Sequence, residues 1–218
     1  MEPQTRDVSG SQPTFPQGPP QRASRRRFPP EGVAFHARRP QHAAGLFALF
    51  SERQFLERAS TLHPAVDEKE INSWLDGIAA ARRFEIVAIS NATVIGFGGL
   101  YVHAGLLDHC GSVTLGVCEN AQGRGVGSTL LAILLATAKL RAKLRKVQLT
   151  VFTDNAPAIR LYCSFGFQFE GLHRCFSRRG EGYVDAYSMA IIFGDEPANP
   201  AKARSGAASR SSSGPESP

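Results

Sequence analysis

The stretch Glu119–Leu140, ENAQGRGVGSTLLAILLATAKL, places three glycines within five residues, directly before a long run of apolar residues at helical spacing. Glycine loses more backbone entropy on folding than any other residue. The cluster Gly123, Gly125 and Gly127 is therefore expected only where the chain needs an approach or a conformation that side chains forbid.

The residues after the glycines predict a helix over about 125–141. Val126, Leu130, Ile133, Leu134 and Ala138 share one face of a helix, and this stripe is expected to pack on a sheet. The run before the glycines, 112–118, has the composition of a strand.

A glycine-rich turn between a strand and a helix is a typical anion site, because the helix N-terminus carries unpaired N–H groups and a partial positive charge. Arg124 would add a charged donor at its edge. No Lys-Ser or Lys-Thr pair follows the glycines, which excludes a P-loop. Ser128 and Leu130 stand where a dinucleotide fingerprint would need its last glycine. The remaining pattern is Gln122-x-x-Gly125-x-Gly127.

The whole chain of 218 residues has the composition of a soluble globular protein, with 42% hydrophobic and 20% charged residues. No apolar run approaches the roughly 20 residues that cross a bilayer. The net charge of +6 favours acidic partners, such as phosphorylated cofactors or nucleic acid, without choosing between them. The four cysteines lack the spacing of metal ligands, so we expect no metal site and a reducing compartment.

The composition divides the chain into one domain and two tails. Residues 1–30 and 195–218 are rich in Pro, Ser, Gln and Arg, so we expect disordered tails around a domain at 31–194. SRRRFPP (Ser24–Pro30) has the arginine pair of an export signal, but no apolar segment follows it. A cytoplasmic protein is therefore expected.

Strand and helix patterns alternate through the domain, which indicates an α/β fold. A tight turn is expected at Asn91–Thr93. The predicted strands are 32–40, 84–90, 93–103, 112–118, 146–152 and two near 167–176 and 183–193; the predicted helices are about 42–53, one from Asp67, 125–141 and 156–165.

A second motif narrows the family. The segment Leu149–Gly171, LTVFTDNAPAIRLYCSFGFQFEG, follows the glycine motif at a suitable distance. Together the two motifs resemble the GNAT superfamily of N-acetyltransferases, and within it the bacterial L-amino-acid N-acetyltransferases. The resemblance covers about 33–192 and is densest over 109–192. It implies the acyl-CoA N-acyltransferase fold, a mixed and mostly antiparallel central sheet flanked by helices and splayed between its fourth and fifth strands.

The resemblance also implies acetyl-CoA as co-substrate and no metal. The pantetheine arm would pair with the end of the fourth strand as an added strand does, and the glycine loop would hold the pyrophosphate. The residues so assigned to acetyl-CoA are Leu115, Gly116, Val117, Gln122, Gly123, Arg124, Gly125, Val126, Gly127, Ser128, Asn155 and Tyr162.

The implied reaction is attack of a neutral amine on the thioester through a tetrahedral oxyanion. The backbone N–H of Val117 would stabilise the oxyanion, and Tyr162 would protonate the thiolate. The alternative for Tyr162 is a packing residue whose hydroxyl is bonded locally. Asn155 would contact the pantetheine or a water, cap the following helix, or do both.

The general base is unassigned. Several GNAT enzymes carry a carboxylate where this chain has Ser112, and serine cannot replace it. Glu119, His109 or a chain of waters remain candidates.

The acceptor must supply an amine, and an amino acid would also need a cation for its carboxylate. Arg174, Arg178 and Arg179 are candidates, or exposed strand residues; Asp185 and Tyr187 either line the pocket or pair across the sheet. We expect an acetyltransferase for a small primary amine, with an L-amino acid as leading candidate. The alternatives are a protein N-terminal or lysine acetyltransferase and a non-catalytic CoA-binding module. No membrane partner and no nucleic-acid partner are expected, and a homodimer stays open.

Overall fold

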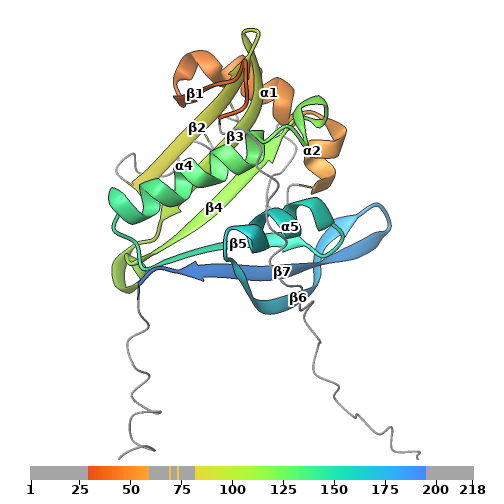
Figure 1. Ribbon diagram of the computed structural model, residues 1–218. Coiled ribbons are helices and arrows are strands. Elements are labelled where there is room, and N and C mark those ends of the chain that lie inside the picture. Colours follow the sequence, from red (N-terminus) through yellow and green to blue (C-terminus); the bar gives the residue numbers. More distant parts are fainter. Residues whose placement is uncertain (1–28, 59–68, 70–72, 74–81, 195–218) are drawn as a thin grey trace, which may run out of the picture.

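The computed structural model describes residues 29–58, 69, 73 and 82–194. Seven strands form one sheet in the order β1-β2-β3-β4-β5-β7-β6, with β4 and β5 parallel and all other neighbours antiparallel (Figure 1). Within these residues, no helix is long and apolar enough to cross a bilayer. The strands are β1 (Ala34–Ala37), β2 (Arg83–Ser90), β3 (Thr93–Val102), β4 (Cys110–Val117), β5 (Lys146–Phe152), β6 (Gln168–Arg179) and β7 (Gly182–Ile192); the helices are α1 (Ala43–Phe50), α2 (Arg53–Arg58), α4 (Val126–Leu140) and α5 (Ala156–Ser164).

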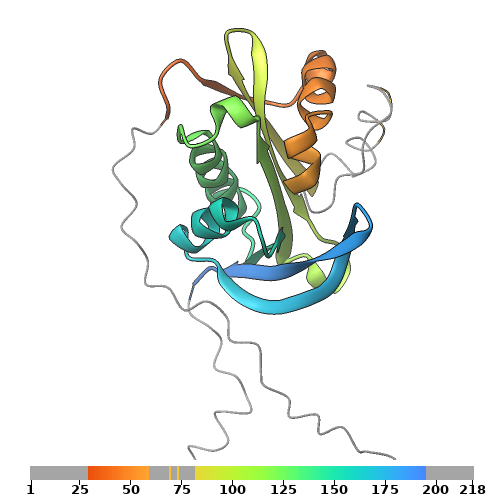
Figure 2. The same ribbon diagram turned by 90° about the vertical axis from the view of Figure 1, so that its right-hand side faces the viewer.

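Helices cover both faces of the sheet. Figure 2 shows α1 and α2 on one face and α4 and α5 on the other, with the β6–β7 hairpin curving beneath them. Alternate residues of β3 serve the two faces. A Cβ on Gly98 would lie 3.0 Å from the Leu134 side chain of α4, whereas the Phe97 ring lies 5.4 Å from that of Phe50 in α1.

The apolar face of α4 anchors the core, as its sequence predicts. Val126, Leu130, Leu134 and Ala138 are buried, and Thr129 between them bonds back to the carbonyl of the loop before the helix. Ile133 is only partly buried and Leu131 is fully buried instead. The helix start is therefore held rigidly against the sheet.

The predicted tight turn is confirmed. Asn91 and Ala92 both have positive φ, 47° and 60°, and join the paired residues Ser90 and Thr93. Positive φ at both central positions defines the type I′ turn that suits a two-residue hairpin.

Two predicted boundaries near the N-terminus are wrong. The strand expected over 32–40 ends at Ala37, because Pro40 begins a 3-10 helix instead of continuing the ladder. The helix expected over 42–53 ends at Phe50, where the Ser51 hydroxyl bonds the Phe47 carbonyl, and a separate helix α2 follows. The helix expected from Asp67 lies outside the described residues.

The parallel pair β4–β5 is short. Only Cys110, Gly111 and Ser112 of β4 pair with β5, opposite the residues 146–148. Beyond Ser112 the two strands part, while each keeps its antiparallel neighbour on the outer side. The splay predicted between the fourth and fifth strands is present, and it opens a gap in the middle of the sheet.

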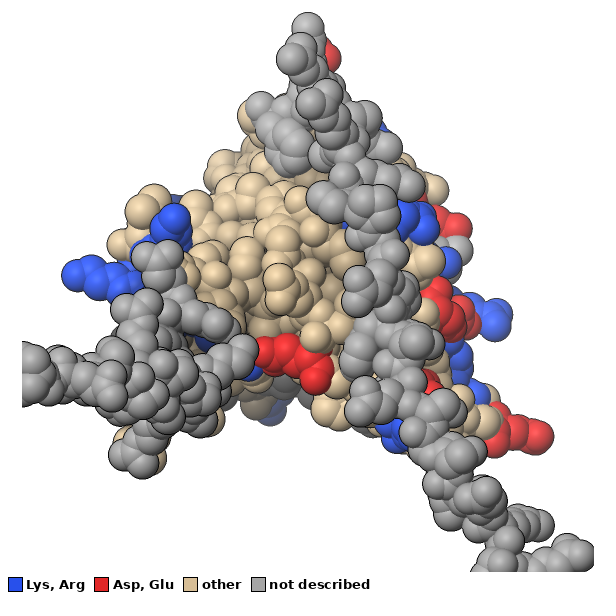
Figure 3. Space-filling view, turned by 60° about the horizontal axis from the view of Figure 1, so that its bottom comes forward, with Lys and Arg blue, Asp and Glu red and all other residues tan. Residues whose placement is uncertain are grey.

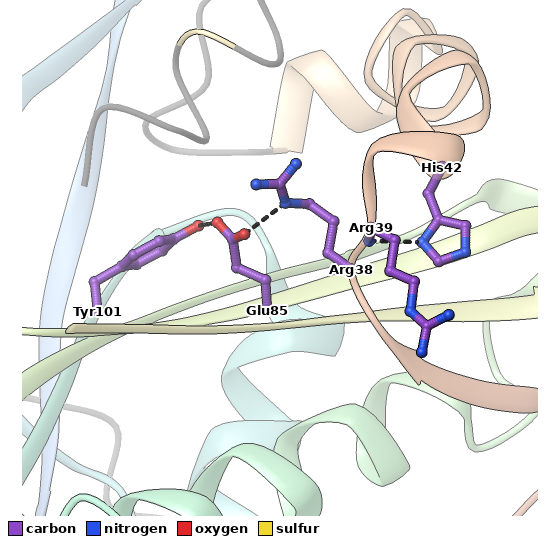
Figure 4. Close-up of polar contacts among 5 residues, drawn as sticks. All are labelled: Arg38, Arg39, His42, Glu85 and Tyr101. Atoms are coloured by element: carbon purple, nitrogen blue, oxygen red, sulfur yellow. Dashed lines mark hydrogen bonds and ion pairs between the residues drawn. The ribbon is translucent and has the colours of Figure 1, made fainter. Parts of the chain in front are cut away.

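His42 gives the fold a defined response to acid. Its ring is buried and its Nδ1 accepts the backbone N–H of Arg39 (Figure 4). Burial, and then the nearby His36, Arg39 and Arg38, lower the pKa of His42 below its ordinary 6.5.

We therefore expect the free energy of unfolding to fall as the pH drops from 7 through 6.5. The unfolded chain takes up a proton at His42 there and the folded protein does not, and the fall stops below the pKa of the folded state. Urea unfolding between pH 7.5 and 5 gives the free energy of unfolding of the protein and of His42→Gln at each pH. The contribution of His42 is the difference between the two plots of this free energy against pH. If the two plots run parallel, the prediction is contradicted.

Candidate active site

A cleft of about 720 Å³ follows the gap between β4 and β5. It reaches the glycine loop before α4 at one end and α2 at the other, so it connects the two faces of the sheet. Its walls are formed by Phe55, Arg58, Tyr101, His103, Ser112, Val113, Thr114, Leu115, Gly116, Val117, Gln122, Gly123, Gly125, Gly127, Ser128, Gln148, Leu149, Thr150, Val151, Asn155, Pro157, Ala158, Arg160, Leu161, Tyr162 and Ser188.

The glycine loop takes a backbone shape that only glycine adopts easily. Gly123 and Gly125 have φ of 72° and 92°, and a Cβ at either position would meet no protein atom within 4 Å. Gly125 is the N-cap of α4, and its carbonyl accepts both the N–H and the hydroxyl of Thr129. These glycines are needed for the left-handed conformation, and the space beside them is open. The first N–H groups of α4 have no intrahelical partner, as in any helix.

The structure separates the other predicted loop residues. Gln122 and Ser128 line the cleft together with the glycines. Val126 is buried in the core, so only its backbone is placed to meet a ligand. Arg124 is exposed and does not line the cleft.

The end of β4 presents a free backbone edge to the cleft. The N–H of Cys118 donates to the Ile95 carbonyl on β3, and N–H groups alternate sides along a strand. The N–H and C=O of Val117 therefore point away from β3, toward the gap. The side-chain amide of Gln122 donates to the Val117 carbonyl at 3.1 Å, which leaves the N–H of Val117 for another acceptor. By the same alternation, the N–H and C=O of Leu115 also point toward the gap.

Two predicted residues come from α5 and its N-terminus. Asn155 is the N-cap: its side-chain oxygen accepts the N–H of Ala158 at 3.3 Å, and Pro157 occupies the first turn. The capping role predicted for Asn155 is confirmed, and the residue also lines the cleft.

Tyr162 belongs to α5. Its side chain lies between that helix and the sheet and lines the cleft. Its side chain is 7% exposed and its ring lies 5.8 Å from that of Phe167. Burial raises the pKa of the Tyr162 hydroxyl well above its ordinary value, so the group stays protonated. Among the described residues the hydroxyl has no hydrogen-bond partner.

Ser112 has a partner that sequence reasoning missed. Its hydroxyl lies 2.8 Å from Nε2 of His103, and both residues line the cleft. His103 follows directly after β3, on the same face as Tyr101, which pairs with Ser112. In the sequence, the two-residue step from Tyr101 to His103 indicates that both side chains lie on one face of a strand. It indicates a contact with Ser112 only when the register of β3 against β4 is known.

The two base candidates named from the sequence lie elsewhere. Glu119 follows β4 and its backbone N–H meets a Glu52 carboxylate oxygen. His109 is exposed, and its carbonyl accepts the N–H groups of Arg145 and Lys146. Neither lines the cleft.

A buried polar chain stands behind Tyr101 on the α1 and α2 face (Figure 4). Arg38 and Glu85 form an ion pair at 2.6 Å with side chains only 7% and 5% exposed. The Tyr101 hydroxyl donates to the other Glu85 oxygen at 3.3 Å. Burial, and then the Glu85 charge, raise the pKa of Tyr101 far above its ordinary value. Tyr101 is thus a fixed neutral group in the cleft wall.

The residues proposed for a substrate carboxylate are outside the cleft. Arg174 and Arg178 are exposed, and Arg179 pairs with Asp154, bonds the Glu57 carbonyl and lies over the Phe152 ring.

The last-strand residues pair within the sheet, which is the second of the two roles considered for them. Asp185 accepts the Cys175 N–H, and the Tyr187 ring contacts that of Phe169. The cations that line the cleft are Arg58 of α2 and Arg160 of α5.

Charged side chains are unevenly spread over the face shown in Figure 3. The visible Lys and Arg side chains lie toward its margins, and a broad area of uncharged residues stands above a group of Asp and Glu side chains near the lower centre. The described residues hold no group of three His, Cys, Asp or Glu side chains arranged for a metal ion.

Comparison with known proteins identifies a family. Residues 19–167 match the model of the "Acetyltransferase (GNAT) family". The L-amino acid N-acetyltransferase AaaT of Escherichia coli is 39% identical over 79 residues, which are 35% of this chain and 49% of AaaT. The N-alpha-acetyltransferase RimI of Mycobacterium tuberculosis is 44% identical over 82 residues, 38% of this chain and 48% of RimI. The chain thus spans about half the length of these curated relatives.

Solved structures share the fold. The structure of yncA from Salmonella typhimurium with its cofactor acetyl-CoA has a TM-score of 0.67 to this chain. The two are 20% identical, and the match covers 78% of this chain and 98% of yncA. At that identity the similarity establishes the arrangement of the sheet and helices.

Proposed function

Because the chain belongs to the GNAT family of acetyltransferases, we propose that it transfers the acetyl group of acetyl-CoA to the primary amine of a small L-amino acid. One observation carries the proposal: β4 and β5 part beyond Ser112, and the cleft between them joins the glycine loop to a buried tyrosine and to the opposite face of the sheet. A long thioester with a diphosphate at one end fits that path.

The glycine loop suits the diphosphate. Gly123 and Gly125 leave open space beside the start of α4, where backbone N–H groups and the helix dipole favour an anion. Arg160 on α5 adds a positive charge to the same cleft. The free N–H of Val117 and the edge around Leu115 suit an extended chain with amide groups, such as pantetheine.

The same arrangement supports direct transfer. The N–H of Val117 points into the gap and is available to a developing oxyanion. Tyr162 holds a proton on a hydroxyl with no partner among the described residues, and is therefore available to the leaving thiolate.

The acceptor is proposed to enter from the α1 and α2 face. There Arg58, in the cleft wall, has no ion pair or hydrogen bond within the described part of the chain. A guanidinium suits the carboxylate of an amino acid. The similarity to RimI supports a second candidate, the N-terminal amine of a protein.

Release of free thiol from acetyl-CoA tests the proposal. The purified protein is assayed with the twenty L-amino acids, with spermine and with a peptide that has a free N-terminus. Release with an amino acid supports the proposal, and release with the peptide alone supports the second candidate. Tight CoA binding by calorimetry without release for any amine would favour a binding module and overturn both.

Arg58→Gln tests the carboxylate contact. We expect the KM for the preferred amino acid to rise roughly ten- to a hundredfold, the equivalent of one hydrogen bond to a charged group, with kcat little changed. Spermine, which has no carboxylate, should be unaffected. Arg53→Gln on the same helix is the control, because Arg53 is exposed, does not line the cleft and pairs with Glu57. Equal losses for both amines would contradict the role.

A further inference from the structure

We propose that Ser112 and His103 form a proton relay that removes a proton from the acceptor ammonium, an inference that rests on the proposed acetyltransferase function. The Ser112 hydroxyl takes up this proton through water in the cleft and passes its own proton to Nε2 of His103.

The pair lies at the closed end of the gap. Ser112 pairs with Gln148 in the last rung that joins β4 to β5, and the strands part directly beyond it. Ser112, His103 and Gln148 all line the cleft there. Val117, whose N–H is proposed to hold the thioester oxygen, lies five residues further along β4, roughly 16 Å away, so water in the cleft must join the ammonium to Ser112.

His103 is held firmly by its backbone. Its N–H donates to the Cys110 carbonyl at 3.0 Å, and its carbonyl accepts from the Arg82 guanidinium at 3.0 Å. The ring then reaches diagonally across the strand pair to the Ser112 hydroxyl at 2.8 Å. A fixed imidazole acting through a hydroxyl is a common arrangement for moving protons near neutral pH.

The other ionisable groups described near the closed end of the gap are not placed to act as the base instead of His103. No described residue that lines the cleft is a carboxylate. Glu85 of β2 is held by Arg38 and reaches the cleft only through the protonated Tyr101. The cations near the pair are Arg82, which bonds the His103 carbonyl, and Arg83, which pairs with Tyr101 between β2 and β3; Arg58 lines the same cleft.

The proton balance closes. As the ammonium passes a proton through cleft water to the Ser112 oxygen, the serine proton moves to Nε2 of His103, and one proton leaves the imidazole for solvent. The amine lone pair then forms the C–N bond, and the C–S bond breaks with its electron pair on sulfur. Tyr162 protonates that sulfur, and the second proton lost by nitrogen as the amide forms restores Tyr162. The products are the amide, the free thiol and one proton.

An NMR measurement tests the relay without any acceptor. Imidazole ¹⁵N spectra of the labelled protein at neutral pH, assigned with His103→Gln, report which ring nitrogen carries the proton. The relay requires an Nδ1–H tautomer, in which Nε2 accepts from Ser112. An Nε2–H tautomer that donates to Ser112 would overturn it.

Kinetics test the same relay with the acceptor that wild-type protein uses best. His103→Gln and Ser112→Ala should each lower kcat at pH 7 roughly a hundredfold or more, with the double variant no worse than either. Ser112→Thr keeps a hydroxyl and should retain most activity. His109→Gln, on the neighbouring loop and outside the cleft, is the control.

The pH profile separates the relay from a structural role. Above the pKa of the acceptor amine, no proton needs removal, so both variants should approach wild-type rates. A loss that is constant across pH, or an acetylated Ser112 found by mass spectrometry, would overturn the relay. If wild-type protein acetylates no amine, the proposed function fails and the relay fails with it, whereas an Nε2–H tautomer in an active enzyme overturns the relay alone.

Discussion

Replacing Tyr162 with phenylalanine should lower turnover roughly a hundred- to ten-thousandfold, the usual range for loss of a general acid. The change removes one hydroxyl that has no partner among the described residues, and leaves the ring on Phe167. The fold should therefore keep its stability, and acetyl-CoA should bind as tightly as before. The loss falls on the transition state, where the departing sulfur becomes an anion.

Single-turnover kinetics and calorimetry distinguish binding from chemistry for this variant. Tyr183→Phe is the matched control, because the Tyr183 side chain is 63% exposed and outside the cleft. A large loss of acetyl-CoA affinity with unchanged turnover of the bound complex would show that Tyr162 binds the cofactor and does not act as an acid.

Gly125→Val should weaken CoA binding by about tenfold or more while the domain stays folded. Gly125 has a φ of 92°, a conformation that costs a branched residue roughly 1–3 kcal/mol. Relief of that strain moves the loop at the start of α4, and the new side chain fills the open space beside it. Both effects act where the diphosphate is proposed to lie.

Gly180→Val controls for strain alone. Gly180 also has a positive φ, 58°, and open space around it, but it lies in the β6–β7 turn away from the cleft. Calorimetric titration with CoA should detect a loss for the Gly125 variant and none for the Gly180 variant. Equal affinities for the two folded variants would remove the glycine loop from the binding site.

Local patterns predicted most of the strands and helices here. The apolar stripe of α4, the Asn91–Ala92 turn and the Asn155 cap all depend on a few neighbouring residues, which the sequence displays directly. The break at Ser51 was missed because a side chain that bonds a backbone carbonyl four residues earlier leaves no mark in the apolar pattern.

Contacts between distant strands were harder to foresee. The pairing of His103 with Ser112 depends on the register of β3 against β4, and a slip of one residue would turn both side chains to the other face. Arg58 was missed for a similar reason, since nothing in its own helix shows that α2 borders the gap. The resemblance to the family predicted the gap between the fourth and fifth strands, but it did not predict which residues line the closed end of that gap.

The parting of β4 and β5 has a consequence for solubility. A sheet normally has two exposed edges, and here the outer ones are blunted: β1 has four residues, and β6 is interrupted by register shifts. The gap adds two more edges in the middle of the sheet, the kind of unpaired backbone that templates aggregation. Both edges border the cleft between β4 and β5, so a strand that paired here would have to enter that cleft. A single extended ligand lying in the cleft would pair with these edges and so protect them from other chains.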